Sequence, residues 1–184
     1  IAAVSVDAKD KCTVFVARAN QLLKTDTCGR DWDQVYYDPR TAQQYTAVQV
    51  DPTNSLVVYA GNADGDILRS EDGGASWRTL HRADARINSF VMDPNGTQTL
   101  YVATNGAGIL KSTDRGTTWQ EIRAELDGYD GGRRPLMLVL DPTNPSVMYH
   151  VSRTGILRSE NGGAAWRAIA TPTPPEQTNI RAFA

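Results

Sequence analysis

The chain has 184 residues, of which 40% are hydrophobic and 22% are charged, proportions that are ordinary for a globular protein with its own core. Its net charge is −2, from 19 basic and 21 acidic residues, which argues against a nucleic acid partner because phosphate binding usually needs a basic surface. No apolar run approaches the roughly 18 residues of a membrane-spanning helix, so we expect no transmembrane segment.

Short apolar segments follow one another along the chain in a fixed succession. The first copy has expected strands at 4–6, 13–16 and 22–24, rich in the β-branched and aromatic residues that strands prefer. Three further copies follow, with expected strands at 48–50, 56–60, 67–69, then 90–92, 99–103, 109–111, then 138–140, 146–150, 156–158. The first strand of these later copies ends at Asp-Pro, because proline cannot donate to a sheet ladder.

An eight-residue stretch, called the box below, follows every third strand. It reads SEDGGASW at 70–77, STDRGTTW at 112–119, SENGGAAW at 159–166 and, in a diverged form, TDTCGRDW at 25–32. The four tryptophans, Trp32, Trp77, Trp119 and Trp166, are 45, 42 and 47 residues apart, and a fourth strand begins at each of them. Four short antiparallel strands per repeat of this size are typical of a β-propeller blade.

The residue types of the box suit a tight turn under an aromatic cover. An Asp side chain can accept hydrogen bonds from N–H groups two residues on, and the glycine at the fifth position of the box can take a positive φ. Ser and Thr hydroxyls can tie the flanks together, while the indole covers the hairpin, and we expect all four tryptophans to cover the core. We therefore expect structural roles for Ser70, Asp72, Gly74, Ser76, Trp77, Ser112, Asp114, Gly116, Thr118, Trp119, Ser159, Asn161, Gly163 and Trp166.

These boxes resemble those of the Asp-box, or bacterial neuraminidase repeat, family of β-propellers, whose pattern is Ser/Thr-x-Asp-x-Gly-x-Thr/Ser-Trp/Phe. The boxes at 70–77 and 112–119 match every position, whereas 159–166 has Asn161 and Ala165, and 25–32 has Thr27 and Asp31. The resemblance implies an all-β fold in which 1–184 is part of one propeller. Its four-stranded antiparallel blades are expected at 1–37, 45–82, 87–124 and 136–170, and residues 180–184 would begin a fifth. We expect a slice of a seven- or eight-bladed parent.

Two cysteines, Cys12 and Cys28, both lie in the first repeat. They are expected either to form a disulfide within that blade, which would cross-link the box at 25–32 that lacks its Asp, or to be two separate buried thiols. A disulfide would indicate an oxidising compartment. The family resemblance independently implies an extracytoplasmic location: periplasmic, lumenal, cell-surface or secreted.

Function is expected on one face of the blades. The Asp-Pro turns and the boxes share a face and are alike in every copy, which favours a structural role. The opposite side, called the link face, carries the second-to-third turns and the links at 33–45, 78–86, 120–135 and 167–179, which vary. Binding residues tend to lie on variable loops. The candidate partner-binding residues are Tyr36, Tyr37, Arg82, Tyr129, Arg133, Arg134 and Arg153.

Other residue patterns are interpreted as structural or solvated. Gly128, Gly131 and Gly132 are expected to loosen the third link, and the recurring Lys24, Arg69, Lys111 and Arg158 to face solvent. The stretch 62–66 has aspartates like a calcium loop but lacks the downstream Glu, and neither histidine has a second within ligand spacing. We therefore expect no metal, no cofactor and no assignable catalytic residue.

Two functions remain open. The favoured one is a non-catalytic docking scaffold for proteins or a subunit of a larger assembly, as the resemblance to the photosystem II assembly and stability factors implies. The alternative is a fragment of a glycoside hydrolase acting on a glycan, either xyloglucanase-like or sialidase-like. Such an enzyme needs two carboxylates flanking the scissile bond, and the sequence offers no pair that we can assign.

Overall fold

The computed structural model describes residues 1–40, 43–93 and 96–170, and the strand expected at 180–184 lies outside them. Within this part the chain is all-β, and it contains no helix long and apolar enough to cross a membrane. Four four-stranded antiparallel sheets form, each with its strands in sequence order, which confirms the predicted fold class. One short 3-10 helix, η1 (Ala124–Leu126), was not predicted.

Strand bounds follow the repeat. The first two sheets contain β1 (Ala3–Val6), β2 (Val14–Arg18), β3 (Gln21–Thr25) and β4 (Asp33–Tyr37), then β5 (Tyr45–Asp51), β6 (Asn54–Asn62), β7 (Asp66–Ser70) and β8 (Arg78–Arg82). The last two contain β9 (Ile87–Met92), β10 (Leu100–Thr104), β11 (Ile109–Ser112) and β12 (Gln120–Ile122), then β13 (Met137–Leu140), β14 (Met148–Val151), β15 (Ile156–Ser159) and β16 (Arg167–Ile169).

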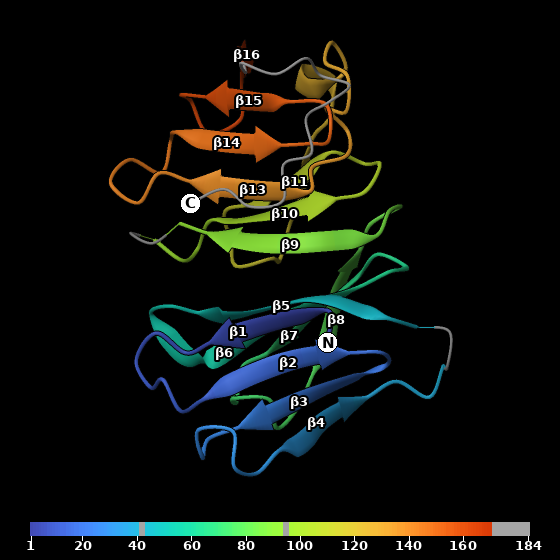
Figure 1. The fold of residues 1–184 in the computed structure, drawn as a ribbon, viewed down its shortest axis with the longest axis vertical. Coiled ribbons are helices and arrows are strands. Elements are labelled where there is room, and N and C mark those ends of the chain that lie inside the picture. Colours follow the sequence, from blue (N-terminus) through green and yellow to red (C-terminus); the bar gives the residue numbers. More distant parts are fainter. Residues whose placement is uncertain (41–42, 94–95, 171–184) are drawn as a thin grey trace. The chain divides into compact units, whose positions relative to one another are not determined.

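The chain divides into two compact units, Ile1–Phe90 and Val91–Ala184. In the first, the sheets β1–β4 and β5–β8 pack face to face (Figure 1) around a core that includes Phe15, Leu22, Tyr45, Val58 and Leu68. Apolar side chains on alternate strand positions face this core, as the two-residue period of a strand requires.

The second unit has the same construction. It contains β10–β12, the end of β9 from Val91 onward, and the sheet β13–β16, which enclose a core that includes Tyr101, Ile109, Leu126, Met148 and Trp166. Leu126 comes from η1, so the third link contributes to the core instead of lying free on the surface. Each unit therefore consists of two propeller-type sheets held together by burial of apolar surface.

Each box is a hydrogen-bonded turn between its third and fourth strands. Ser70 Oγ accepts from Gly74 N at 2.8 Å and donates to Asp72 Oδ1 at 2.8 Å. The Asp72 carboxylate in turn accepts from Ser76 N at 2.8 Å and Ser76 Oγ at 2.6 Å. The expectation that Asp bonds N–H groups two residues on is therefore wrong, because the carboxylate reaches four residues on and closes the whole turn.

The other boxes keep this arrangement with different side chains. Asp114 accepts from Thr118 N and Oγ1 at 2.8 and 2.6 Å, and Asn161 Oδ1 accepts from Ala165 N at 2.8 Å. In the diverged box the Thr27 hydroxyl takes the place of the carboxylate and accepts from Asp31 N at 2.9 Å. The turn thus requires a hydrogen-bond acceptor at this position, but the acceptor does not have to be charged.

Two successive residues of every box have left-handed backbone. The second is the expected glycine, with φ of 84° at Gly29, 95° at Gly74, 86° at Gly116 and 90° at Gly163. The first is Gly73 or Gly162 in two boxes but Cys28 (φ 57°) and Arg115 (φ 59°) in the others, a strained conformation for a residue with a side chain. The sequence did not reveal this first position, because two of its four occupants are not glycine.

The box carboxylates make stability depend on pH. Hydrogen bonds from Ser76 and Thr118 lower the pKa of Asp72 and Asp114 to about 2, below the roughly 3.9 of an unfolded chain. Because the folded pKa is depressed, this stabilisation is present above about pH 4 and is lost as pH falls toward 2.

We therefore expect the double variant Asp72→Asn/Asp114→Asn to lose less stability than the wild type between about pH 5 and pH 2 in urea unfolding. Asn is a matched replacement, since Asn161 already serves in the fourth box. Identical pH profiles for the two proteins would contradict this role of the carboxylates.

The tryptophans do not share one environment. Trp166 is 8% exposed, stacks edge-on against His150 at 6.0 Å between ring centroids, and donates from Nε1 to Gly163 O at 3.0 Å. Trp77 is half-buried and packs against Tyr36. Trp32 makes the same indole bond to Gly29 O but is 43% exposed, so the expectation that it covers the core is wrong.

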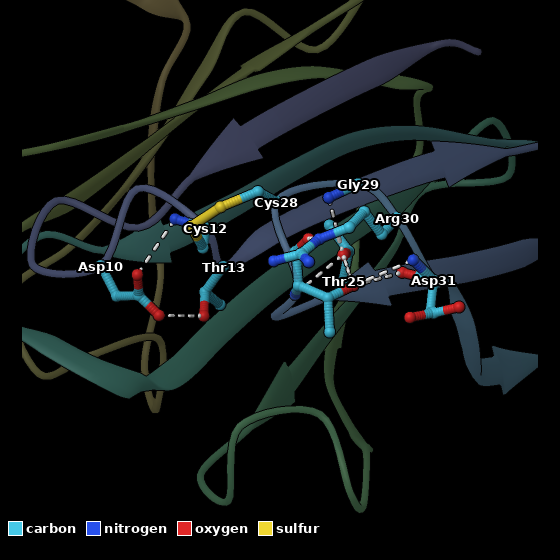
Figure 2. The surroundings of a disulfide bond; sticks show 9 residues. Asp10, Cys12, Thr13, Thr25, Cys28, Gly29, Arg30 and Asp31 are labelled. Carbon is cyan, nitrogen blue, oxygen red and sulfur yellow. Dashed lines mark hydrogen bonds between the residues drawn. A yellow bond between two sulfur atoms is a disulfide. The ribbon is translucent and has the colours of Figure 1, made fainter.

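Cys12 and Cys28 form a disulfide, which confirms the first of the two expectations (Figure 2). Cys28 occupies the strained first position of the diverged box, and Cys12 lies just before β2. The bond therefore ties the box in which a threonine replaces Asp to the start of the neighbouring strand.

Candidate functional site

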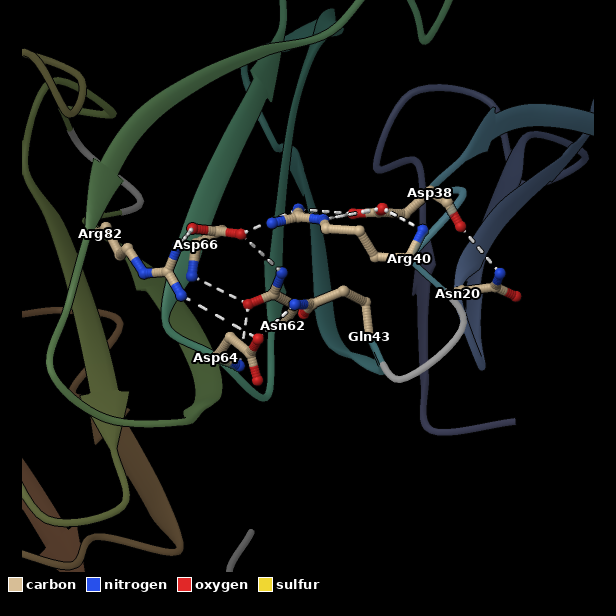
Figure 3. Close-up of polar contacts among 8 residues, drawn as sticks. All are labelled: Asn20, Asp38, Arg40, Gln43, Asn62, Asp64, Asp66 and Arg82. Atoms are coloured by element: carbon tan, nitrogen blue, oxygen red, sulfur yellow. Dashed lines mark hydrogen bonds and ion pairs between the residues drawn. The ribbon is translucent and has the colours of Figure 1, made fainter.

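In the first unit the link face is built around a network of ion pairs (Figure 3). Arg40, on the link after β4, donates from Nε and Nη2 to Asp38 at 3.0 and 2.7 Å, and from Nη2 to Asp66 at 3.2 Å. Arg82, at the end of β8, approaches the other oxygen of Asp66 at 3.6 Å. Both carboxylates are buried, whereas both guanidinium groups are more than half exposed.

The turn that carries Asp66 is fixed by Asn62. This buried side chain accepts from Asp64 N at 3.1 Å and Asp66 N at 2.8 Å, and its amide donates to Asp66 Oδ2 at 3.1 Å. Gln43 donates to Asp64 from the link. The loop that resembled a calcium site therefore binds protein groups instead, and the described residues contain no cluster of three or more metal-ligating side chains.

Charge within this network is close to balanced. Three carboxylates, Asp38, Asp64 and Asp66, meet two guanidinium groups, which leaves one negative charge. The bond from Arg40 holds the pKa of Asp38 below its usual value, so this carboxyl stays ionised at neutral pH. The cluster locks the link to the turn of the next sheet and is not a site for an anion.

In the second unit the third link is held in place along its length. His150 Nε2 lies 2.7 Å from Gly132 O, Thr154 Oγ1 donates to Asp130 O at 2.7 Å, and the Arg133 carbonyl accepts from Gly106 N at 2.9 Å. A Cβ on Gly132 would lie 2.2 Å from Leu126 O, and one on Gly131 would lie 2.4 Å from Thr154 Oγ1. Gly131 and Gly132 thus allow close packing, and the expectation that they loosen the link is wrong.

The predicted partner-binding residues fall into two groups. Tyr36 packs in the first core, Tyr129 packs in the second and donates to Trp166 O, and Arg82 and Arg133 are ion-paired with aspartates. By contrast, Tyr37, Arg134 and Arg153 are exposed, and within the described residues neither arginine makes an ion pair.

Arg134 and Arg153 lie close in the fold. Leu136 N donates to Val151 O at 2.8 Å, so the link before β13 runs beside the turn after β14. Two cations without an ion pair in the described part of the chain therefore gather with the exposed Leu136 at one edge of this link face. Surface of this kind can meet an acidic, partly apolar protein segment.

Comparison with known proteins identifies the family of the chain. A family model described as Sortilin, neurotensin receptor 3 (Sortilin-Vps10) matches residues 65–174, which is more than half of the chain. The chain belongs to the Sortilin-Vps10 family. No curated protein sequence matches it.

Solved structures support the β-propeller fold of the chain. A crystal structure of an ancestral GH74 enzyme superposes with a TM-score of 0.76 at 22% identity, covering 94% of this chain and 24% of that one. The nidogen structure from a nidogen/laminin complex gives 0.64 at 18% identity, covering 86% and 61%. YCF48 bound to D1 peptide gives 0.55 at 14%, covering 90% and 80%.

These likenesses establish the fold alone. The present chain spans only about a quarter of the GH74 enzyme that it resembles. The three proteins include an enzyme and two proteins solved with protein or peptide partners, so the propeller fold is compatible with either function.

Proposed function

We propose that this chain is part of a non-catalytic, extracytoplasmic propeller that docks a protein partner on its link face. One observation carries the proposal: in the second unit the link face presents Arg134 and Arg153, which are exposed and make no ion pair among the described residues, beside the exposed Leu136. In the first unit this face presents the exposed Tyr37. Pre-organised surface of this kind favours binding because little conformational freedom is lost on association.

The contacts of Asp38, Asp66 and Asp127 disfavour these carboxylates as the general acid of a glycoside hydrolase. A general acid needs a carboxyl group whose pKa is raised, so that it carries a proton near neutral pH. On the link face the bonds from Arg40 and Arg133 lower the pKa of Asp38 and Asp127, and Asp66 contacts two arginines. Ion-paired carboxylates can accept hydrogen bonds but cannot donate a proton to a leaving group.

Two further findings support the proposal. The neighbours YCF48 and nidogen were solved with a peptide and with laminin, so propellers of this fold can bind proteins. The Cys12–Cys28 disulfide fits an oxidising compartment outside the cytoplasm. The likeness to a GH74 enzyme favours a glycan-active fragment as the second candidate.

A site-specific cross-linking experiment tests the docking role. We expect a photo-crosslinking residue at Leu136, which lies between Arg134 and Arg153 in the second unit, to capture one discrete protein from the native extract. The double variant Arg134→Glu/Arg153→Glu should reduce this capture at least tenfold, as lost charge complementarity predicts. A cross-linker at Tyr37 tests the first unit by itself. The matched control is a cross-linker at Arg78, an exposed arginine beside the box 70–77 that is paired with Glu71 at 3.8 Å.

The two candidate functions give different outcomes. Equal capture from Arg78 and from the link face would contradict docking at that face. Hydrolysis of a polysaccharide panel, abolished by Asp66→Asn, would establish the glycoside hydrolase instead.

A further inference from the structure

His150 lies in the core of the second unit, where it contacts the third link from inside. It is fully buried on β14, it is paired with Leu138 and Leu157 on the flanking strands, and its ring packs edge-on against Trp166. Its Nε2 lies 2.7 Å from Gly132 O. Because a carbonyl oxygen can only accept, Nε2 carries the proton and donates to the link.

This bond holds the part of the link that carries the docking side chains. Gly132 lies two residues before Arg134 and four before Leu136. Gly132 is itself buried, so its carbonyl would stay unpaired in the core if the histidine were lost. The bond from Thr154 Oγ1 to Asp130 O, at 2.7 Å, is exposed, so water can replace it. The internal bond therefore constrains the link more strongly than the external one.

We propose that His150 is the positioning residue of the docking surface in the second unit: its neutral imidazole fixes the backbone that presents Arg134 and Leu136. The inference rests on the proposed function, because it explains what keeps that surface in one geometry. His150 itself is fully buried and does not touch the partner. It acts through the link, by holding one carbonyl in the core.

The surroundings of His150 favour the neutral ring. Its Nδ1 is buried and makes no hydrogen bond with the described residues, so a proton there would place an unpaired charge in the core. The titratable side chains of this core are Tyr101 and Tyr129. Arg158 and Arg167 are paired with each other across β15 and β16, on the face opposite Leu157. The charged side chains of the adjoining link are exposed: Arg123, Glu125, Asp127, Asp130, Arg133 and Arg134.

The hold on the link should therefore depend on pH with a definite sign. Burial lowers the pKa of His150 below its usual 6.5, although its backbone hydrogen bonds partly oppose this. The hold is thus complete above about pH 6.5, and below it each pH unit favours opening of the link about tenfold, because the exposed ring takes up a proton. The chain has two histidines, and the other, His81, lies on β8 of the first unit.

Hydrogen exchange of the full chain measures the hold on the link directly. We compare protection factors, which correct for the intrinsic pH dependence of exchange, over residues 127–134 at about pH 7.5 and about pH 5.5. In the wild type we expect a loss of about tenfold at the lower pH, while β14 and β15 stay protected.

Two variants separate the hydrogen bond from the shape of the ring. His150→Phe keeps a ring against Trp166 but has no donor, so link protection should be at least about tenfold lower at both pH values. His150→Gln has an amide that can donate to Gly132 O and does not titrate, so it should restore protection at both pH values. Capture from the cross-linker at Leu136 should fall in the first variant and recover in the second.

Thr154→Val is the matched control, because it removes the exposed link bond and leaves His150 in place. It should change link protection less than about threefold, since water replaces the hydroxyl.

Link protection that is the same in the wild type and in His150→Phe would overturn the proposal, and so would equal losses in the Phe and Gln variants. If His150→Phe does not fold, a wild-type link whose protection is equal at the two pH values would overturn it instead. Failure of the docking function has a different sign: the cross-linker at Leu136 captures no discrete protein even in the wild type.

Discussion

Replacing Trp166 by alanine should destabilise the second unit by about 3–5 kcal/mol, the usual cost of removing a large buried aromatic side chain. The indole is 8% exposed and belongs to the core between β9–β12 and β13–β16, where it packs edge-on against the fully buried His150. Removal would leave a cavity and break the bond from Nε1 to Gly163 O. Urea unfolding followed by circular dichroism measures the effect.

Trp32→Ala is the matched control for this prediction. Trp32 holds the same place in its box and donates the same indole bond, at 3.2 Å to Gly29 O, but it is 43% exposed. Its loss should cost about 1 kcal/mol or less, as exposed substitutions usually do. Equal losses of stability at the two sites would mean that the position in the box, and not burial in the core, determines how much a tryptophan contributes to stability.

Removing the disulfide with Cys12→Ser/Cys28→Ser should destabilise the first unit by about 3 kcal/mol. The bond closes a loop across a sequence separation of 16, and restricting a loop of that length in the unfolded chain is worth about this much. The effect should be large here because the diverged box lacks a carboxylate: Thr27 Oγ1 accepts from Asp31 N, whereas Asp72 binds both the N–H and the hydroxyl of Ser76.

Chemical reduction of the disulfide provides an independent measurement of its contribution to stability. Unfolding of the wild type in the presence of a thiol reductant should match that of the double serine variant, while the variant itself should not respond to the reductant. A loss below about 1 kcal/mol in both experiments would mean that the Thr27 turn is sufficient and that the disulfide adds little.

The repeat made most of the fold predictable. Strand order, the position of every box and the start of each fourth strand follow from local patterns, because a propeller sheet is built from consecutive strands. Local sequence patterns do not predict how one sheet contacts the next within a unit. Lys24 and Lys111 look like ordinary exposed strand residues in sequence, and only the neighbouring box shows that they are donors.

The contacts within the candidate site were not predictable from the sequence. Variation among links pointed to the link face, yet Arg40 and Asp66 are 26 residues apart and nothing in the sequence indicates that they pair. Tyr36 and Tyr129 look like exposed loop aromatics, although each packs in a core. Residues 131–132 look flexible, and their packing against Leu126 and Thr154 depends on how the link folds back.

Hydrogen exchange of the chain with and without its cross-linked partner tests the central claim most directly. If the link face is the docking surface, added protection should appear at 123–136 and 152–155, with no change in the boxes at 70–77, 112–119 and 159–166. Protection confined to the boxes, with the link face unchanged, would contradict the account.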